Sequence, residues 1–438
     1  MPWLLNIVYA GLLLVLSPVI VWRMLRHGRY RQGAAEKLLG CLPVTTGERP
    51  VVWFHAVSVG EVLQLQKVVQ HFREATDQRF QILITTSTDS GYDVAKERYV
   101  DCTVSWFPLD FSWAVSRALQ RVQPELVVLA ELEFWPGFLN ACRRMDVKTA
   151  VINARMSDHS YRGYGRLKWL IGPLLNHFSV VAAQTDEYAS RLIDLGTPRE
   201  CTTATGSIKF DGVRTDRSNP ETTALRTLFN IQPNDIVLIA GSTQDPEEQM
   251  AVDAWMELRN GRPDLRLILV PRHRERFNAV ASMLQNQQID CVRRSQMDSV
   301  DTNADRNSVI LLDTIGELSA CWGLADLAFV GGSFGSRQGQ NMLEPAAYGA
   351  AVLFGPKTGN FRDIVKSLLA EKAAIVVPSP DQFVAELRQL LDDDIRRTEM
   401  ENRASELVLR QQGAIGQTVE LLAAVCEAGD SASQRTAA

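Results

Sequence analysis

The chain has 438 residues, of which 46% are hydrophobic and 22% are charged, and its formal net charge is −5. This length accommodates two domains of ordinary size, each with a core of its own. The acidic balance argues against a nucleic-acid-binding protein, whose binding surface would be basic. Six histidines and seven scattered cysteines show neither metal-ligand spacing nor a disulfide framework, so we expect no metal site and no disulfide bonds.

The N-terminal stretch predicts a membrane anchor. Residues 3–22, WLLNIVYAGLLLVLSPVIVW, are uncharged and mostly apolar, and about 20 such residues suffice to cross a bilayer. Four arginines follow directly: Arg23, Arg26, Arg29 and Arg31. Because positively charged flanks stay on the cytoplasmic side, we expect the rest of the chain to lie in the cytoplasm. A helix lying in the membrane interface is the alternative, since Asn6 and Pro18 interrupt the apolar run.

From residue 50 onward, short apolar runs alternate with helical patterns. The first runs are VVWFHAV (51–57), FQILITT (80–86), ELVVLAE (125–131), KTAVIN (148–153) and SVVAAQ (179–184). The polar stretch VRTDRSNPETTA (213–224) predicts a linker. A second series follows: IVLIAG (236–241), LRLILVP (265–271), SVILLD (308–313), DLAFVGG (326–332), AAVLFG (350–355) and AAIVV (373–377). Near-continuous apolar strands separated by helices indicate parallel sheets covered on both faces.

These patterns predict an α/β fold of two doubly wound, Rossmann-like domains with a cleft between them. Ligands of such sheets bind at the carboxyl ends of the strands, so the chemistry is expected there. Residues 381 to 426 are helical in pattern, and a tail of small and polar residues follows. We expect a membrane anchor with a basic juxtamembrane segment, a first domain, a second domain and a disordered tail, at residues 1–45, 46–215, 216–427 and 428–438.

Three glutamates are expected at helix starts near the carboxyl ends of strands. Ser58-Val59-Gly60-Glu61 fits the S-x-x-E capping box, in which the hydroxyl and the carboxylate accept backbone N–H groups. The box recurs at Thr314 to Glu317, and with asparagine as the cap at Asn341 to Glu344. Because ligands bind at the same edge, Glu61 is either a cap or a reactive carboxylate, and the pattern alone leaves both open. The helix dipole favours its charged form, which can accept a proton.

Further polar groups follow other strands. Arg272 comes directly after 265–271, and its planar fork suits a phosphate, although a surface arginine is the alternative. FVGGSFGSRQGQNMLEP is a glycine-rich turn whose backbone amides could approach an anion. Glu131 and Glu133 end another strand, and Lys209 lies near the domain junction, where a cation could neutralise a leaving phosphate. Salt bridges are the alternative for these three.

Many long motifs together resemble one family. They are WFHAVSVGEV, TTSTDSGYDVA, FPLDF, ELEFWP, NARMSDHSYRGY, TGSIKFD, AGSTQDPEE, VPRHRERF, LLDTIGEL, ADLAFVGGS and QNMLEPAAYG. In this order they are similar to the 3-deoxy-D-manno-octulosonic acid (Kdo) transferases, membrane-anchored enzymes of lipopolysaccharide assembly. The resemblance covers nearly the whole chain, to about residue 377.

The resemblance implies an inverting glycosyltransferase of the GT-B type at the cytoplasmic side of the inner membrane. It would move Kdo from CMP-Kdo to a lipid A precursor of the lipid IVA type, without a cofactor or a required metal. Glu61 matches the family's general base, and Glu131 and Lys209 match positions assigned to transition-state stabilisation. The positions implied to bind CMP are Pro271, Arg272, Ile315, Gly316, Glu317, Asn341, Met342, Leu343 and Glu344.

Five positions depart from the family pattern. Histidine is usual at Gln244 and Gln340, glycine at Pro246, and asparagine at Ser207 and Gly137. The two glutamines keep hydrogen-bonding capacity but cannot become cationic, which concerns donor choice. A divergent paralogue using another CMP-ulosonate or a sialic-acid-like donor is therefore one alternative. An inactive anchored protein that binds the nucleotide sugar or the lipid is another.

Overall fold

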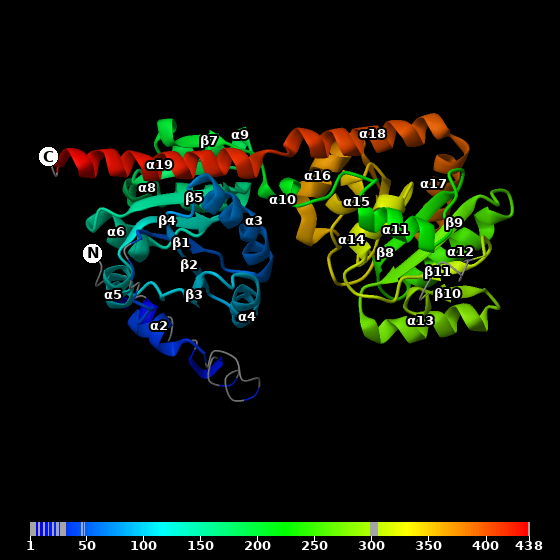
Figure 1. Cartoon of the computed structure of the whole chain (residues 1–438), viewed down its shortest axis with the longest axis horizontal. Helices are drawn as coiled ribbons and strands as arrows, with labels where there is room; N and C mark the ends of the chain where they lie inside the picture. Colours follow the sequence, from blue (N-terminus) through cyan, green and yellow to red (C-terminus); the bar gives the residue numbers. More distant parts are fainter. Residues whose placement is uncertain are drawn as a thin grey trace. The chain divides into compact units, whose positions relative to one another are not determined.

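The computed structural model describes residues 32–44, 47, 49–297 and 305–436, together with twelve residues between 6 and 26. It divides into a first unit, residues 1–212 with 411–438, and a second unit, residues 213–410. Each unit contains a seven-stranded sheet whose strands pair in parallel (Figure 1). The α/β fold with two parallel sheets is therefore confirmed.

Nine of the 20 residues of the predicted membrane anchor, 3–22, lie outside the described residues. None of the helices that the structure describes is long and apolar enough to cross a membrane. Among the described residues of this stretch, Asn6 hydrogen-bonds the backbone and side chain of Ser112 at 2.9 and 2.8 Å. Tyr9 donates to Asp110 at 2.9 Å. These two side chains therefore contact the first unit.

The first sheet has the order β3-β2-β1-β4-β5-β6-β7. Its strands are β1 (Val51–His55), β2 (Gln81–Thr86), β3 (Thr103–Trp106), β4 (Pro124–Ala130), β5 (Lys148–Ala154), β6 (Phe178–Ala183) and β7 (Thr202–Ala204). Every residue of β1 is buried, because helices cover both faces. Trp53 packs into the core on one face and Phe54 into the core on the other.

The helices of the first unit are α2 (Ala34–Leu39), α3 (Val59–Ala75), α4 (Asp89–Arg98), α5 (Ser112–Val122), α6 (Pro136–Arg144), α7 (Asp158–Gly165), α8 (Lys168–Leu175), α9 (Asp186–Leu195), α10 (Ile208–Asp211) and α19 (Ala414–Thr436), with the 3-10 turn η1 (Arg199–Cys201). Helix α3 buries the apolar face that its spacing predicts, from Val62 to Phe72. The C-terminal helix α19 packs against the same core through Ile415, Val419 and Leu422.

The second sheet has the order β10-β11-β9-β8-β12-β13-β14. Its strands are β8 (Ile236–Thr243), β9 (Leu265–Pro271), β10 (Cys291–Arg293), β11 (Val309–Leu311), β12 (Leu327–Val330), β13 (Ala351–Phe354) and β14 (Ala374–Val376). The helices are α11 (Pro220–Leu228), α12 (Glu247–Arg259), α13 (Arg274–Asn286), α14 (Leu318–Cys321), α15 (Leu343–Ala347), α16 (Arg362–Ala370), α17 (Pro380–Asp392) and α18 (Asp394–Gln411), with the 3-10 turns η2 (Arg294–Gln296), η3 (Trp322–Leu324) and η4 (Gly359–Phe361).

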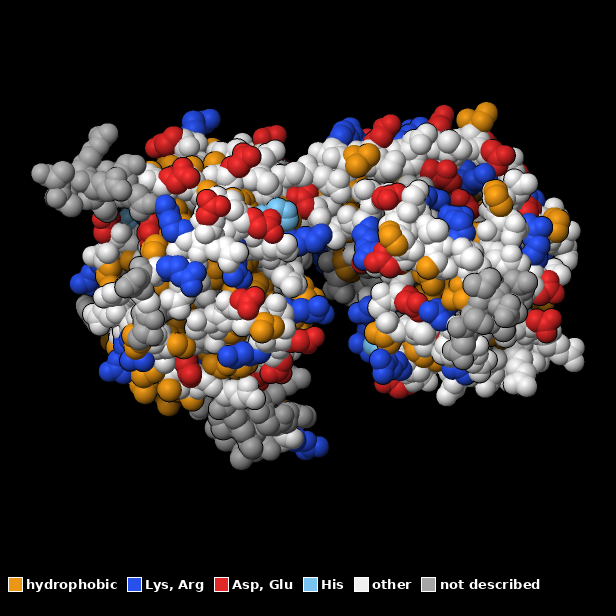
Figure 2. Space-filling model, viewed as in Figure 1, with side chains coloured by type: hydrophobic (Ala, Val, Ile, Leu, Met, Phe, Trp, Pro, Cys, Tyr) orange, Lys and Arg blue, Asp and Glu red, His pale blue; other side chains and the backbone are white. Residues whose placement is uncertain are grey.

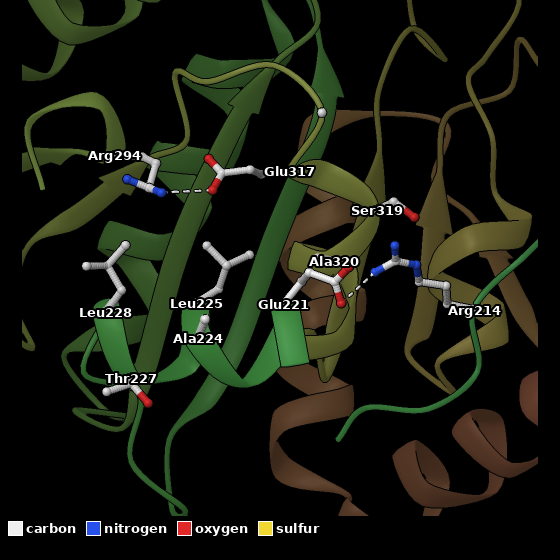
Figure 3. Close-up of a pocket in the computed structure, with 11 residues that line it drawn as sticks. Arg214, Glu221, Ala224, Leu225, Thr227, Leu228, Arg294, Glu317, Ser319 and Ala320 are labelled. Atoms are coloured by element: carbon white, nitrogen blue, oxygen red, sulfur yellow. Dashed lines mark hydrogen bonds and ion pairs between the residues drawn. The ribbon is translucent and has the colours of Figure 1, made fainter. Parts of the chain in front are cut away.

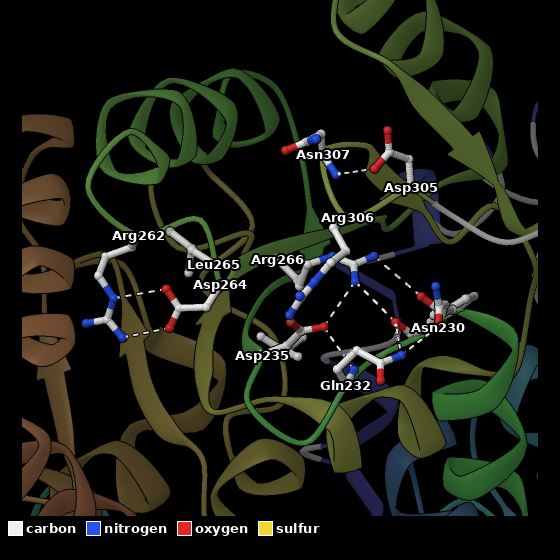
Figure 4. A network of polar contacts seen from close by, with 12 residues as sticks. Asn230, Gln232, Asp235, Arg262, Asp264, Leu265, Arg266, Asp305, Arg306 and Asn307 are labelled. Carbon is white, nitrogen blue, oxygen red and sulfur yellow. Dashed lines mark hydrogen bonds and ion pairs between the residues drawn. The ribbon is translucent and has the colours of Figure 1, made fainter.

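A buried ion pair fastens the second sheet at the amino ends of its strands. The side chains of Arg266 in β9 and Asp235, which precedes β8, are both fully buried and lie 3.1 Å apart. Asp235 also accepts the backbone N–H of Gln232 at 2.9 Å and contacts Arg306 (Figure 4). Removing one partner would leave the other charge buried and unpaired, so the network stabilises the second sheet. It lies at the amino ends of the strands, away from the carboxyl ends where ligands are expected to bind.

Three boundaries differ from the sequence prediction. Residues 220–224 of the expected linker form the first turn of α11, because Asn219 accepts the N–H of Thr222 at 2.9 Å and Pro220 occupies the first helical position. The expected second domain, 216–427, loses its last helix, because α19 buries its apolar face on the first unit. The expected disordered tail continues α19 to Thr436, since its alanines and serines permit helix.

Candidate functional site

Glu61 lies in the first turn of α3, directly after the carboxyl end of β1. Its carboxylate accepts two hydrogen bonds, from the Ser58 hydroxyl at 2.6 Å and from the Val57 backbone N–H at 3.0 Å. The Ser58 hydroxyl in turn accepts the Glu61 N–H at 3.3 Å, so the predicted capping box forms. The Glu61 side chain is only partly buried. Capping therefore fixes the carboxylate and still leaves it accessible.

Glu131 and Lys209 meet in the first unit. Glu131 follows β4 with a left-handed φ of 58°, and its N–H donates to the Ile152 carbonyl at 2.9 Å. Its carboxylate lies 3.8 Å from the Lys209 ammonium group, and the two side chains are 27% and 32% exposed. The salt-bridge alternative thus holds for this pair. A partly exposed pair contributes little stability, so the arrangement leaves its charges available to a ligand.

Glu133 adds a third carboxylate to this part of the first unit. Burial first, and then the negative charges of Glu61 and Glu131, raise the pKa of Glu133 to about 7. The indole N–H of Trp135 donates to its carboxylate at 2.8 Å and opposes part of this shift. A carboxyl group with a pKa near neutrality can take up or release a proton at working pH. The sequence points to Glu133 at a strand end but gives it no role.

His55, at the end of β1, is fully buried and stacks on Phe107 with ring centroids 3.7 Å apart. Burial lowers its pKa to about 3, against a smaller opposing effect of the Thr85 carbonyl, 3.1 Å from Nδ1. The imidazole is therefore neutral at physiological pH, and its Nδ1 atom lies 3.1 Å from both the carbonyl and the hydroxyl oxygen of Thr85.

In the second unit, Arg272, Asn341 and Glu344 lie at the carboxyl edge of the sheet. The Arg272 N–H donates to the Thr243 carbonyl at 3.0 Å, and its side chain is exposed. The Asn341 amide donates to the Glu344 carboxylate at 2.9 Å. Burial raises the pKa of Glu344, while Asn341 and the positive charge of Arg272 oppose the shift. Arg272 therefore lies close enough to Glu344 to act on its charge.

The remaining residues implied to bind CMP are buried or exposed to different degrees. Pro271, Met342 and Leu343 are buried, so their side chains shape the edge and only their backbone atoms could reach a ligand. Ile315, in contrast, is 57% exposed. Helix α15 begins at Leu343, and its N-cap is Met342, which makes no side-chain cap hydrogen bond, so the asparagine cap expected at Asn341 is wrong. The Asn341 side chain instead accepts the Leu343 N–H at 3.1 Å, one residue before the cap position.

Glu317 lines a cavity of about 590 Å³ beside α11 and α14 (Figure 3). Arg294 holds its carboxylate at 2.9 Å, and the Thr314 hydroxyl contacts the other oxygen. The capping box expected here is wrong, since α14 begins only at Leu318 and Glu317 makes no cap hydrogen bond. Gly316, with a left-handed φ of 95°, interrupts the helix that the spacing predicts.

The glycine-rich turn after β12 already binds a carboxylate group of the same chain. The carboxylate of Glu247 is buried and accepts the backbone N–H groups of Gly332, Ser333 and Phe334 at 2.7, 2.9 and 3.1 Å. It also accepts the Gln244 N–H at 3.0 Å. These three amides are therefore not free for a phosphate, and for the rest of the segment the expectation of an anion-binding turn stays a prediction.

Two residues of the second unit that the sequence pattern does not single out thus hold the candidate site: Arg294 contacts Glu317, and Glu247 contacts the turn after β12. Arg294 follows β10, a three-residue strand with no apolar run, so its place at a strand end was not visible. Glu247 lies just after β8, and only the fold brings it to the turn after β12.

Comparisons with known proteins give the class and the family. Residues 26–212 match the model of a family described as 3-deoxy-D-manno-octulosonic-acid transferase (kdotransferase). A 3-deoxy-D-manno-octulosonic acid transferase of Haemophilus influenzae is 31% identical over 420 residues, which cover 94% of this chain and 97% of that protein. This chain is a glycosyltransferase. It belongs to the Kdo transferase family.

Two solved structures are also similar to this chain. The C-terminal CMP-Kdo binding domain of WaaA from Acinetobacter baumannii is 29% identical and covers 43% of this chain and 96% of that domain, with a TM-score of 0.39. UDP-GlcNAc 2-epimerase from Neisseria meningitidis, bound to UDP-GlcNAc, is 13% identical and covers 85% of this chain and 99% of that one, with a TM-score of 0.55. At that identity the second similarity concerns the fold alone.

Proposed function

We propose that this protein transfers Kdo from CMP-Kdo to a hydroxyl group of a lipid A precursor of the lipid IVA type, in lipopolysaccharide core biosynthesis. The observation that carries the proposal is the partly exposed carboxylate of Glu61, fixed by hydrogen bonds of 2.6 and 3.0 Å at the carboxyl edge of the first sheet. Family membership supports Kdo as the transferred sugar.

In this proposal Glu61 is the general base. It takes the proton of the acceptor hydroxyl while that oxygen attacks C2 of Kdo, and the bond from C2 to the phosphate oxygen breaks as CMP leaves with its electron pair. One displacement inverts the anomeric centre and requires only one base. The Glu131–Lys209 pair, 3.8 Å apart, would stabilise the transition state, because its lysine can meet developing negative charge.

The second unit would bind the CMP part of the donor. The exposed guanidinium of Arg272 suits the phosphate, and Glu344, which Asn341 holds at 2.9 Å, can accept hydrogen bonds from ribose hydroxyls. The turn of Ile315, Gly316 and Glu317 would border the nucleotide. The proposed reaction involves no cofactor and no metal ion.

The proposed location is the inner membrane, with both units on its cytoplasmic side. The apolar residues 3–22 and the arginines after them support an anchor. Exposed apolar side chains of the first unit also support contact with lipid, since they gather near α2 and α5 (Figure 2): Leu38, Leu39 and Trp113 are 44%, 49% and 51% exposed.

A transfer assay tests the function. The purified protein is incubated with CMP-Kdo and a tetra-acylated disaccharide acceptor, and CMP release is measured together with the mass of the acceptor. We expect CMP release coupled to a gain of Kdo on the acceptor, and loss of both in Glu61→Gln with CMP binding kept. Transfer from another CMP-ulosonate but not from CMP-Kdo would identify a paralogue. Donor binding without any transfer would identify a binding protein.

A further inference from the structure

Two glutamine side chains meet at one glycine in the second unit. Gln244 follows β8, and Gln340 lies in the segment before α15. A Cβ atom built on Gly332 would lie 3.1 Å from the Gln340 amide nitrogen and 3.6 Å from the Gln244 amide nitrogen. Both amide groups therefore lie close to Gly332, which has no side chain and adopts a left-handed φ of 68°.

The Gln244 amide nitrogen is buried and has no hydrogen-bond partner among the described residues. The same holds for the Thr243 hydroxyl, one residue earlier. A buried donor left without a partner costs about 1–3 kcal/mol, so such atoms in a native structure require an explanation. The nearby carboxylate of Glu247 already accepts four backbone N–H groups. An acceptor from outside the chain would therefore satisfy the Gln244 amide.

The two glutamine amides lie beside the residues proposed to bind CMP, and this position indicates which ligand would accept their hydrogen bonds. The Thr243 carbonyl accepts the N–H of Arg272, so the turn that carries Gln244 adjoins the residue proposed to bind the donor phosphate. Gln340 directly precedes Asn341, which holds Glu344. The amides thus border the proposed CMP site. The part of CMP-Kdo that lies next to its phosphate is the sugar acid, whose carboxylate offers two acceptor oxygens.

We propose that Gln244 and Gln340 form an uncharged subsite that donates hydrogen bonds to the carboxylate of the CMP-activated sugar acid. This inference rests on the proposed function and assigns part of its substrate specificity. Amide donors select for an acceptor at that position, and they bind an anion without adding a charge of their own. The subsite therefore distinguishes the sugar acid from the nucleotide alone.

Binding measurements separate these two parts of the donor. CMP and CMP-Kdo are titrated, without acceptor, into the full-length protein and into Gln244→Leu, Gln340→Leu and Gln244→Glu. Each leucine variant should weaken CMP-Kdo about tenfold, the usual effect of losing a hydrogen bond to a charged group, and leave CMP within about twofold. Gln244→Glu should weaken CMP-Kdo further, because two carboxylates repel each other. Gln285→Leu, on the exposed side of α13, is the matched control and should change neither.

The outcomes separate the subsite from the function. Retained CMP binding shows that a variant is folded, so a selective loss of CMP-Kdo supports the subsite. Unchanged CMP-Kdo binding in all three variants would overturn it, and so would an equal loss of CMP and CMP-Kdo. If the unaltered protein binds CMP but not CMP-Kdo, the proposed function itself fails and the sugar acid is not its ligand.

Discussion

The hydroxyl group of Ser58 donates to the carboxylate of Glu61 at 2.6 Å and accepts the backbone N–H of the same residue at 3.3 Å. The helix cap Ser58 and the candidate base Glu61 thus form one hydrogen-bonded pair. Because the helix start fixes the rotamer of Glu61, the cap residue positions the carboxylate as well as stabilising α3.

Ser58→Ala should therefore affect both stability and catalysis. Loss of an N-cap hydroxyl costs about 1 kcal/mol of unfolding free energy. The freed carboxylate should also lower kcat by about tenfold to hundredfold, since small misplacements of a reacting group have effects of that size. Urea unfolding and initial transfer rates measure the two effects.

Thr185→Ala supplies the matched control for that cap. Thr185 caps α9 in the same unit by accepting the Tyr188 N–H at 3.2 Å. We expect a similar loss of stability, about 1 kcal/mol, and an unchanged kcat. An equal fall of kcat in both variants would show that Ser58 acts through stability alone.

The sequence predicts most of the strands and misses three of the four that lie at sheet edges. The missed strands β3, β7 and β10 have four, three and three residues and each lies at the end of its sheet. An edge strand has a neighbour on one side only and needs no long apolar run. Whether these strands form depends on the adjacent strand, and the local sequence pattern does not specify that neighbour.

The candidate site, too, could be predicted from the sequence only in part. Ser58 and Glu61 could be paired from spacing alone, because a cap is local in sequence. The raised pKa of Glu133 could not be predicted, because it arises first from burial and then from the charge of Glu61, which another segment carries. Equally, the occupied turn at Gly332 depends on Glu247, a residue far from it in the sequence.

Glu133 should make the stability of the first unit depend on pH. Its folded pKa, about 7, lies above the ordinary value of 4.5, so the folded state holds a proton that the unfolded state has lost. Its stabilising effect is complete below about pH 4.5 and disappears as the pH rises through 7. Since the group is partly exposed and screened by solvent, we expect about 1 kcal/mol.

Glu133→Gln removes this titration and keeps an acceptor for Trp135, 2.8 Å away. Relative to the unaltered protein, the variant should gain stability between pH 5 and 8. Thermal unfolding across that range measures the difference. Glu97→Gln, whose side chain is 72% exposed, is the control for the same substitution at an exposed glutamate of the first unit. A difference for Glu133→Gln that stays constant from pH 5 to 8 would contradict the raised pKa of Glu133.

Glu247→Ala should strongly destabilise the second unit. The substitution leaves the buried N–H groups of Gly332 and Ser333 without their acceptor. At about 1–3 kcal/mol for each orphaned donor, we expect a loss of about 3 kcal/mol or more. Glu275→Ala, on the exposed surface of α13, should stay within about 0.5 kcal/mol. Equal unfolding midpoints for the two variants would show that the turn does not depend on Glu247.

Gly137→Ala should destabilise the first unit although alanine favours helices. Gly137 lies in the first turn of α6, where Asp110 accepts its N–H at 2.8 Å and that of Phe138 at 2.6 Å. A Cβ atom at this position would come within 2.6 Å of the Asp110 carboxylate and 2.8 Å of its backbone carbonyl. Such crowding costs about 1–3 kcal/mol and outweighs the helix preference of up to about 1 kcal/mol.

Gly163→Ala in α7 isolates that helix preference, because a Cβ atom there meets nothing within 4 Å. It should stabilise the protein by up to about 1 kcal/mol. Gly137→Asn should be at least as destabilising as Gly137→Ala, since its larger side chain starts from the same crowded Cβ. Thermal unfolding of the three variants measures the order. If Gly137→Asn were as stable as the unaltered protein, the crowding by Asp110 would not determine stability at this position.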